Sequence, residues 1–229
     1  MTGNIFGKLY QLSSFGESHG KMIGGIIEGL PSGFELDFDF IQNELSRRSP
    51  KGFHWETSRK EADIVEFVSG IIDNKAIGAP IAFLIKNSDQ RSADYESLEH
   101  AFRPSHADYT YFEKYGIRDH RGGGRSSARE TANRVVGGAI AKTFLRKKGV
   151  IINSFTKAIG SVEVDIPIII PVKIVESDPL RCPDPSKSKL MLEQLEDAKL
   201  KGDTLGGIIH CVVSGVKAGL GEPVFDKIH

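Results

Sequence analysis

The most constraining feature of this sequence is a run of three glycines followed by a strongly amphipathic segment. The glycines are Gly122 to Gly124, and the apolar residues after them recur with the 3.6-residue period of an α-helix. These apolar residues are Ala132, Val135, Val136, Ala139, Ile140 and Phe144. Ser127 and Glu130 stand at capping-box spacing, and Gly149 is a suitable C-terminal stop. The pattern predicts a helix that buries one face and begins just after a turn where the backbone can approach a ligand closely.

Strand patterns surround that helix. We expect strands over Ile5–Leu12, Met22–Leu30, Ile64–Ile72, Ala79–Ile85, 150–156, 160–165 and 207–216. Shorter helices are predicted from the N-cap Asp37 to about Arg48 and over 189–200, and Asp73-Asn74 is predicted to form a hairpin turn. Strands and helices do not alternate strictly, which favours the α+β class with mostly antiparallel sheets.

Composition excludes several classes of protein. The 229 residues are 39% hydrophobic and 26% charged, and 30 basic residues balance 30 acidic ones, so no global positive field favours nucleic acid or an anionic membrane. The sequence opens without a signal-peptide pattern, and the apolar run 166–172 is far shorter than the roughly 20 residues that span a bilayer. Two cysteines without CxxC spacing fit a reducing compartment. These features predict a cytoplasmic protein with no metal site and no membrane or nucleic-acid partner.

A local cluster of positive charge stands out against that neutral background. Arg118, Arg121, Arg125, Arg129 and Arg134 fall within 17 residues that contain only two carboxylates. Together with the glycines and the start of a helix, they predict an anion site for which phosphate is the natural ligand. A solvated arginine-rich turn is the alternative interpretation of the same residues.

Two histidines lie in unusual surroundings. His19 sits in the glycine-bounded turn Gly16–Gly20, and His106 lies between Arg103 and Asp108, which could orient it for acid–base chemistry. The remaining histidines are interpreted as surface or structural residues; they are His54, His100, His120, His210 and His229.

Other patterns have alternative interpretations. The turn Gly16–Gly20 also fits G-x-S-x-G, which would make Ser18 a hydrolase nucleophile, but strand-like residues follow where that motif needs a helix. The aromatic cluster Tyr109, Tyr111, Phe112 and Tyr115 could stack on a flat ring, although core packing is the commoner role. An RNA-binding module is disfavoured by zero net charge and a short RGGGR stretch.

Taken together, the motifs resemble the chorismate synthase family, in the family's order and over nearly the whole chain. They are GESHG at 16–20, RRSP at 47–50, NSDQRSADY at 87–95, RPSHADYTY at 103–111, GGGRSSARETANRVVGGAIA at 122–141, RCPDP at 181–185, GDTLGG at 202–207 and GLGEPVFDK at 219–227. The resemblance implies a lyase that converts 5-enolpyruvylshikimate 3-phosphate to chorismate and phosphate by anti 1,4-elimination, the last step of the shikimate pathway, with reduced FMN as cofactor.

The resemblance also implies roles for individual residues. His19 would protonate the departing phosphate, and His106 would lie by the flavin and set its protonation. The implied FMN contacts are Arg125, Ser126 and Ser127, and the implied partners of substrate or nucleotide anions are Arg48, Arg129 and Arg134. Two positions depart from the family pattern: His54 stands where arginine is common, in the loop expected to contact the substrate or a reduced nucleotide such as NADP, and Ser105 replaces a glycine.

The implied fold is a β-α-β sandwich, with a helical layer between antiparallel sheets, in a homotetramer. We expect one domain over 1–229 that lacks the family's usual C-terminal segment, and a separate flavin reductase as the source of reduced FMN. The alternative function is a non-catalytic phosphate- or FMN-binding fragment, or a regulatory protein.

Overall fold

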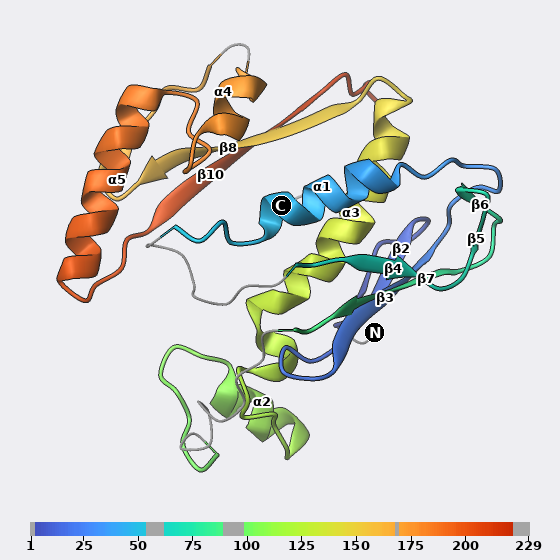
Figure 1. Cartoon of the computed structure of the whole chain (residues 1–229), viewed down its shortest axis with the longest axis horizontal. Coiled ribbons are helices and arrows are strands. Elements are labelled where there is room, and N and C mark those ends of the chain that lie inside the picture. The colour runs from blue at the N-terminus through green and yellow to red at the C-terminus, as the bar shows by residue number, and fades with distance from the viewer. Residues whose placement is uncertain (1–2, 54–61, 89–98, 168–169, 222–229) are drawn as a thin grey trace. The chain divides into compact units, whose positions relative to one another are not determined.

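The computed structural model describes residues 3–53, 62–88, 99–167 and 170–221. The chain divides into two compact units, Met1–Thr143 and Phe144–His229, each described below by itself (Figure 1). Every strand pairing in the described residues is antiparallel, and helices accompany both larger sheets. The predicted α+β class is therefore confirmed.

The first unit is built on a five-stranded sheet in the order β1-β2-β3-β7-β4. Its strands are β1 (Ile5–Phe6), β2 (Gln11–Gly16), β3 (Met22–Glu28), β4 (Val65–Phe67) and β7 (Ile81–Lys86). The turn between β2 and β3 is the predicted glycine-bounded turn, and the pairing of Gly16 with Ile23 sets its ends. The sequence around His19 is therefore held at one end of a hairpin.

Two helices bury their apolar faces with this sheet in one core. Helix α1 (Phe38–Arg48) begins at the predicted N-cap Asp37, whose side chain accepts a hydrogen bond from the Phe40 amide, and it contributes Ile41 and Leu45. Helix α3 (Thr131–Arg146) contributes most of the predicted stripe, with Val136 and Ile140 fully buried, but Phe144 near its end is exposed and lies outside this core. Figure 1 shows both helices running alongside the sheet. The periodicity of the sequence correctly identified these two faces.

Two of the strand predictions in the first unit need correction. The expected strand Ile5–Leu12 is broken, because the chain turns at Gly7, where φ is +96° and an added Cβ would lie 1.9 Å from the Tyr10 carbonyl oxygen. The expected pair Ile64–Ile72 and Ala79–Ile85 becomes four strands, since β5 (Ile71–Ile72) and β6 (Lys75–Ala76) form a small separate hairpin. Asp73-Asn74 is its turn, as predicted, with both φ angles positive.

A helix that the sequence pattern did not predict, α2 (Asp108–Tyr115), carries the aromatic cluster. Tyr109, Phe112 and Tyr115 are exposed, so core packing was the wrong interpretation for these three. Phe102 packs against two of them, with ring centroids 5.5 and 5.7 Å from Tyr109 and Phe112. The rings therefore form a small surface cluster.

The second unit has a three-stranded sheet in the order β10-β8-β9 and two helices. These elements are β8 (Ile151–Ile159), β9 (Val162–Glu163), α4 (Val172–Ser177), α5 (Pro185–Leu200) and β10 (Gly207–Ser214). Its core combines residues from both sheet and helices: Phe155, Val164, Val175, Cys182 and Met191. Helix α5 starts four residues earlier than predicted because Asp184 caps it and Pro185 occupies its first turn.

The described helices include none that is both long and apolar enough to cross a bilayer. Cys182 and Cys211 are both free thiols.

The shared core of the first unit makes a stability prediction. Leu45→Ala should lower the free energy of unfolding by about 2–5 kcal/mol, because the side chain is fully buried between α1 and the sheet. Leu9→Ala is the control, since Leu9 is 93% exposed, and it should change stability by less than about 0.5 kcal/mol. Urea unfolding measures both, and equal losses would contradict this description of the core.

Candidate active site

The glycine run and the turn that carries His19 pack directly against each other. Gly122, Gly123 and Gly124 all have positive φ angles, of +62°, +84° and +54°. A Cβ on Gly122 would lie 2.1 Å from Cε1 of His19, and the Ser18 amide donates a hydrogen bond to the Gly124 carbonyl oxygen at 3.3 Å. Glycine is needed here for the left-handed backbone and for the space that the imidazole fills.

Ser18 and His19 form a buried hydrogen-bonded pair. Ser18 Oγ lies 3.0 Å from His19 Nδ1 and 3.2 Å from the Gly122 carbonyl oxygen. Because a carbonyl oxygen can only accept, the arrangement that satisfies both contacts has the hydroxyl donating to Gly122 and Nδ1–H donating to Oγ. Nε2 is then the second ring nitrogen of His19, which carries a proton when the ring is an imidazolium.

This geometry also bears on the hydrolase interpretation. Ser18 is only 1% exposed, and the turn leads from strand β2 into strand β3 rather than into a helix. A nucleophile elbow needs an exposed hydroxyl on a strand-to-helix turn. The G-x-S-x-G match is therefore coincidental.

His106 lies in the wall of a cavity of about 360 Å³, together with Ser126 and Ser127. Its Nδ1 is 2.9 Å from the Pro104 carbonyl oxygen, so Nδ1 carries a proton and donates it to that oxygen. The preceding residue, Ser105, has φ of +59°, which explains why glycine suits that position in the resembled motif.

A second cavity, of about 600 Å³, adjoins the first along the glycine run. Both are lined by Ala107, Asp108, Gly123 and Ser126. The larger one adds Arg118, Arg121 and Arg125 and the rings of Tyr111 and His120. The structure thus brings together His106, Arg125, Ser126 and Ser127 as the sequence predicted, and it adds His120, which the sequence analysis had interpreted as a surface or structural residue.

Arg103 and Asp108 form a bidentate ion pair at the start of α2. Nε and Nη2 of Arg103 lie 2.8 and 2.9 Å from the two carboxylate oxygens. Hydrogen bonding from Arg103 lowers the pKa of Asp108 to about 2. The pair fixes the segment that carries His106.

The arginine cluster is largely neutralised by carboxylates of the same chain. Arg121 pairs with Asp119 at 2.9 Å, and Arg125 pairs with Glu130 at 2.8 Å while its Nη2 donates to Ser14 Oγ at 2.8 Å. Burial raises the pKa of Asp119, but the hydrogen bonds from Arg121 outweigh this and leave it lowered. The side chain of Glu130 binds Arg125 instead of completing the expected capping box. In the folded chain these carboxylates balance the charges of Arg121 and Arg125, so the arginine cluster is less positive than its sequence suggests.

Arg48 and Arg129 meet at a residue that the sequence analysis did not select. Asp63 forms ion pairs with both, at 2.7 Å from Arg48 Nη1 and with Nη1 of Arg129. Asn87 accepts a hydrogen bond from Arg129 Nε at 2.9 Å, and its amide nitrogen donates to the Glu17 and Gly20 carbonyl oxygens. No spacing in the sequence links residue 63 to residue 129, because their contact is purely tertiary.

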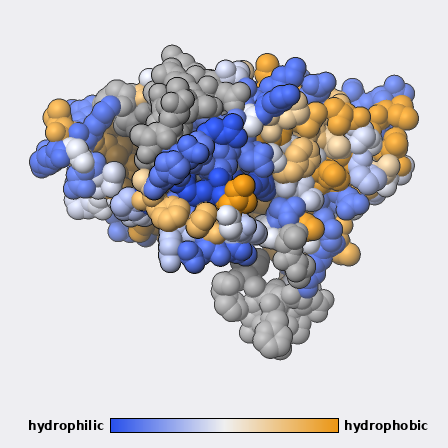
Figure 2. All heavy atoms as spheres, turned by 90° about the horizontal axis from the view of Figure 1, so that it is seen from below, coloured by the Kyte–Doolittle hydropathy of each residue, from blue (hydrophilic) through white to orange (hydrophobic). Residues whose placement is uncertain are grey.

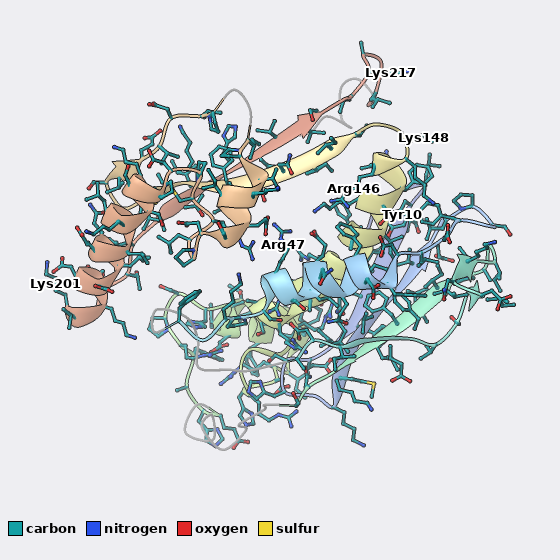
Figure 3. The ribbon with its side chains drawn as sticks, turned by 45° about the horizontal axis from the view of Figure 1, so that its top comes forward. Tyr10, Arg47, Arg146, Lys148, Lys201 and Lys217 are labelled. Carbon is teal, nitrogen blue, oxygen red and sulfur yellow. The ribbon has the colours of Figure 1, made fainter. Side chains whose placement is uncertain are left out.

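Arg134 lines neither of these two cavities. It lines a different cavity of about 390 Å³, bounded by β1, β2 and α3, which also includes Tyr10. Tyr10 donates a hydrogen bond to the Gly137 carbonyl oxygen at 2.7 Å, and burial raises its pKa (Figure 3).

Within residues 3–53, 62–88, 99–167 and 170–221, no group of histidine, cysteine and carboxylate side chains could hold a metal ion. His54 lies outside those ranges. On the face shown in Figure 2, hydrophilic residues gather in the middle of the described surface.

Packing of the glycine run makes a sharp prediction. Gly122→Ala should destabilise the chain by roughly 2–4 kcal/mol, since the added methyl meets the His19 ring and the backbone is left-handed. Gly138→Ala is the matched control: nothing lies within 4 Å of its Cβ in helix α3, so we expect a gain of up to about 1 kcal/mol. Thermal unfolding of the two variants is the measurement, and equal behaviour would refute the packing.

The Arg103–Asp108 pair predicts an acid-dependent loss of stability. The pKa of Asp108 is lowered from 3.8 to about 2, so the pair's contribution is complete above pH 4 and is lost as the pH falls toward 2. This corresponds to ~2 kcal/mol. Asp108→Asn should be less stable at pH 6 and should show a shallower decline between pH 4 and 2. Parallel stability curves for wild type and variant would contradict the assignment.

Comparison with known proteins agrees with these features. A family model described as chorismate synthase matches residues 10–229. The chain is 52% identical over 227 residues to a chorismate synthase of Bacteroides fragilis, covering 99% of this chain and 63% of that protein. It is 52% identical over 230 residues to one of Christiangramia forsetii, covering 100% of this chain and 64% of that protein.

A solved structure gives the same result. The structure titled "Crystal Structure of Chorismate Synthase" aligns with a TM-score of 0.74 at 32% identity, covering 94% of this chain and 60% of that chain. The chain spans somewhat less than two thirds of the length of these relatives. The extent of the family match and the identity to these relatives show that the chain belongs to the chorismate synthase family.

Proposed function

We propose that this chain carries the site at which 5-enolpyruvylshikimate 3-phosphate loses phosphate to form chorismate, with reduced FMN as cofactor. The observation that carries the proposal is the packing of the His19 turn against the glycine run, whose other residues line the cavities beside His106 and Arg125. Family membership supports the reaction class.

The two adjoining cavities suit a phosphorylated flat cofactor. Arg125, Ser126 and Ser127 would hold FMN, with guanidinium and hydroxyl groups for its phosphate and polar edge. The Tyr111 ring is available for contact with its ring system. The chemistry that reduced FMN would supply when bound there is transient donation of an electron and help in removing the C6 hydrogen.

His19 is proposed as the acid that protonates the departing phosphate. Ser18 and Gly122 hold its Nδ1 side, so the proton to be transferred resides on Nε2 of the imidazolium. Phosphate is a better leaving group when it is protonated, which is why an acid at this position favours breaking the C–O bond.

His106 is proposed to set the protonation of the flavin. Its Nδ1 is committed to the Pro104 carbonyl oxygen, which leaves Nε2 to accept or donate a proton on the cavity side. The Arg103–Asp108 ion pair supports the segment that positions it.

Arg48, Arg129 and Arg134 are proposed as partners of the substrate's anionic groups. Arg48 keeps a partly exposed guanidinium, whereas Arg129 is buried with all three guanidinium nitrogens hydrogen-bonded within the chain, so its contact with the substrate stays a prediction from the resemblance. Arg134 lies beside the separate cavity that includes Tyr10, and its role stays a prediction from the resemblance.

The cellular setting is also a proposal. Free thiols at Cys182 and Cys211 fit a reducing compartment such as the cytoplasm. We propose a homotetramer that receives reduced FMN from a separate reductase. Contacts with NADP near His54 stay a prediction, since they fall on residues outside the described ranges.

Replacement of the two histidines tests the proposed chemistry. With chemically reduced FMN under anaerobic conditions, His19→Ala and His106→Ala should each lower the rate of chorismate formation by about 10²–10⁴-fold, because each removes an acid–base group. His100→Ala, at an exposed histidine away from both cavities, should retain the wild-type rate.

The outcomes of that experiment separate the alternatives. Near-normal turnover in both variants would refute the assigned roles. A wild-type chain that perturbs the flavin spectrum but releases no phosphate would instead support the non-catalytic binding function.

A further inference from the structure

One buried carboxylate is shared by two of the predicted anion-binding arginines. The Asp63 side chain is fully buried. Its Oδ2 accepts from Arg48 Nη1 at 2.7 Å and from Ser49 Oγ at 2.7 Å, and its Oδ1 accepts from Arg129 Nη1. Each carboxylate oxygen is therefore committed to a different guanidinium.

Arg129 is the inner partner of this carboxylate. All three of its guanidinium nitrogens are engaged: Nη1 with Asp63, Nε with Asn87 Oδ1 at 2.9 Å and Nη2 with the Lys86 carbonyl oxygen at 3.2 Å. Its side chain is only 3% exposed. A buried guanidinium requires a counter-charge, and Asp63 is the carboxylate that provides it.

Arg48 is the outer partner, and it keeps an unused edge. Its Nε donates to Thr131 Oγ1 at 2.9 Å and its Nη1 to Asp63, while Nη2 has no hydrogen-bond partner among the described residues. The side chain is 21% exposed. Among the described residues, the two guanidiniums and the one carboxylate of this group leave a net charge of +1, and Arg48 is the more exposed of the two arginines.

The neighbouring arginine behaves differently. Arg47 pairs with Glu44 at 2.9 Å, and Glu44 also pairs with Lys142 at 2.6 Å. Arg47 therefore pairs with a carboxylate of helix α1, which it shares with Lys142. The two adjacent arginines at the end of that helix thus bind different carboxylates, Glu44 and Asp63.

The backbone holds Asp63 in place independently of its charge. Gln42 of helix α1 donates from Nε2 to the Asp63 carbonyl oxygen at 3.1 Å. The residue has φ of +49°, in the left-handed region that a non-glycine residue adopts at a cost. These contacts hold the Asp63 backbone beside helix α1, and from there its carboxylate binds both guanidiniums.

We propose that Asp63 is a positioning residue that neutralises Arg129 and aims Arg48 at the phosphate or a carboxylate of the substrate. This role rests on the proposed function for the identity of the ligand, but the pinning of Arg48 does not depend on it. Preformed guanidinium geometry strengthens anion binding because less side-chain freedom is lost. Asp63 itself does not touch the ligand.

Two measurements on the chain test this role. The first is the hydrogen-exchange rate of the Arg48 Nη1 hydrogens, which bind Asp63, measured by ¹⁵N NMR and assigned by their loss in Arg48→Lys. The second is the affinity for 5-enolpyruvylshikimate 3-phosphate by calorimetry. In Asp63→Asn we expect exchange and the dissociation constant each to rise by about tenfold or more. Arg47→Lys, at an arginine that does not bind Asp63, should leave both unchanged.

A double-mutant cycle separates positioning from a general loss of structure. In an Arg48→Lys background, Asp63→Asn should weaken binding by less than about twofold further, because the effect acts through Arg48. Additive losses would overturn the proposal, as would a folded Asp63→Asn variant with wild-type exchange and affinity. If Asp63→Asn does not fold, Asp63→Glu replaces it, and faster Arg48 exchange with unchanged affinity would then overturn the proposal.

Failure of the proposed function would look different. If the wild-type chain does not bind the phosphate ester but Arg48 exchange still depends on Asp63, the substrate assignment is wrong and the positioning role stands. Inorganic phosphate then serves as the probe in the same cycle.

Discussion

The buried ion pair between Asp63 and Arg129 is the interaction on which the arrangement of the candidate site depends. Arg129 precedes helix α3, Asp63 precedes strand β4, and Asn87, which also binds Arg129, follows strand β7 and holds the His19 turn through two carbonyl oxygens. Removing one partner of such a buried pair typically costs about 3–5 kcal/mol, since the other charge is left uncompensated. The network therefore links the core of the first unit to the residues proposed to do the chemistry.

The glycine run also depends on a tertiary contact, its close packing against the turn that carries His19. Three successive left-handed residues allow the backbone to lie against the His19 ring, and the carbonyl groups of Gly122 and Gly124 accept from the side chain and amide of Ser18. A side chain at Gly122 would occupy the space of the imidazole. The loop that borders the two cavities and the turn that carries the proposed acid are thus one packed unit.

Much of the fold was predictable because its elements carry strong local signals. Helices α1 and α3 follow from apolar periodicity, Asp37 from capping chemistry and the β5–β6 turn from Asp73-Asn74. Two features were harder to predict. Gly7 interrupts a segment whose apolar pattern predicts one continuous strand, and helix α2 was not predicted because its aromatic residues face outward. In the candidate site, histidines and glycines were identifiable by their unusual sequence context, while Asp63, Asn87 and His120 were not.

The sequence by itself determined the α+β class, the helix that follows the glycine run and, through its ordered motifs, membership of the chorismate synthase family. Those properties depend on local periodicity, turn chemistry and residue identity. Only the tertiary structure decided which carboxylate each arginine binds, that Arg48 and Arg129 share Asp63 while Arg134 borders another cavity, and that Ser18 orients His19. Charge pairing acts between groups that the fold brings within a few ångströms, and residues 63 and 129 acquire that proximity only when the sheet and helices pack.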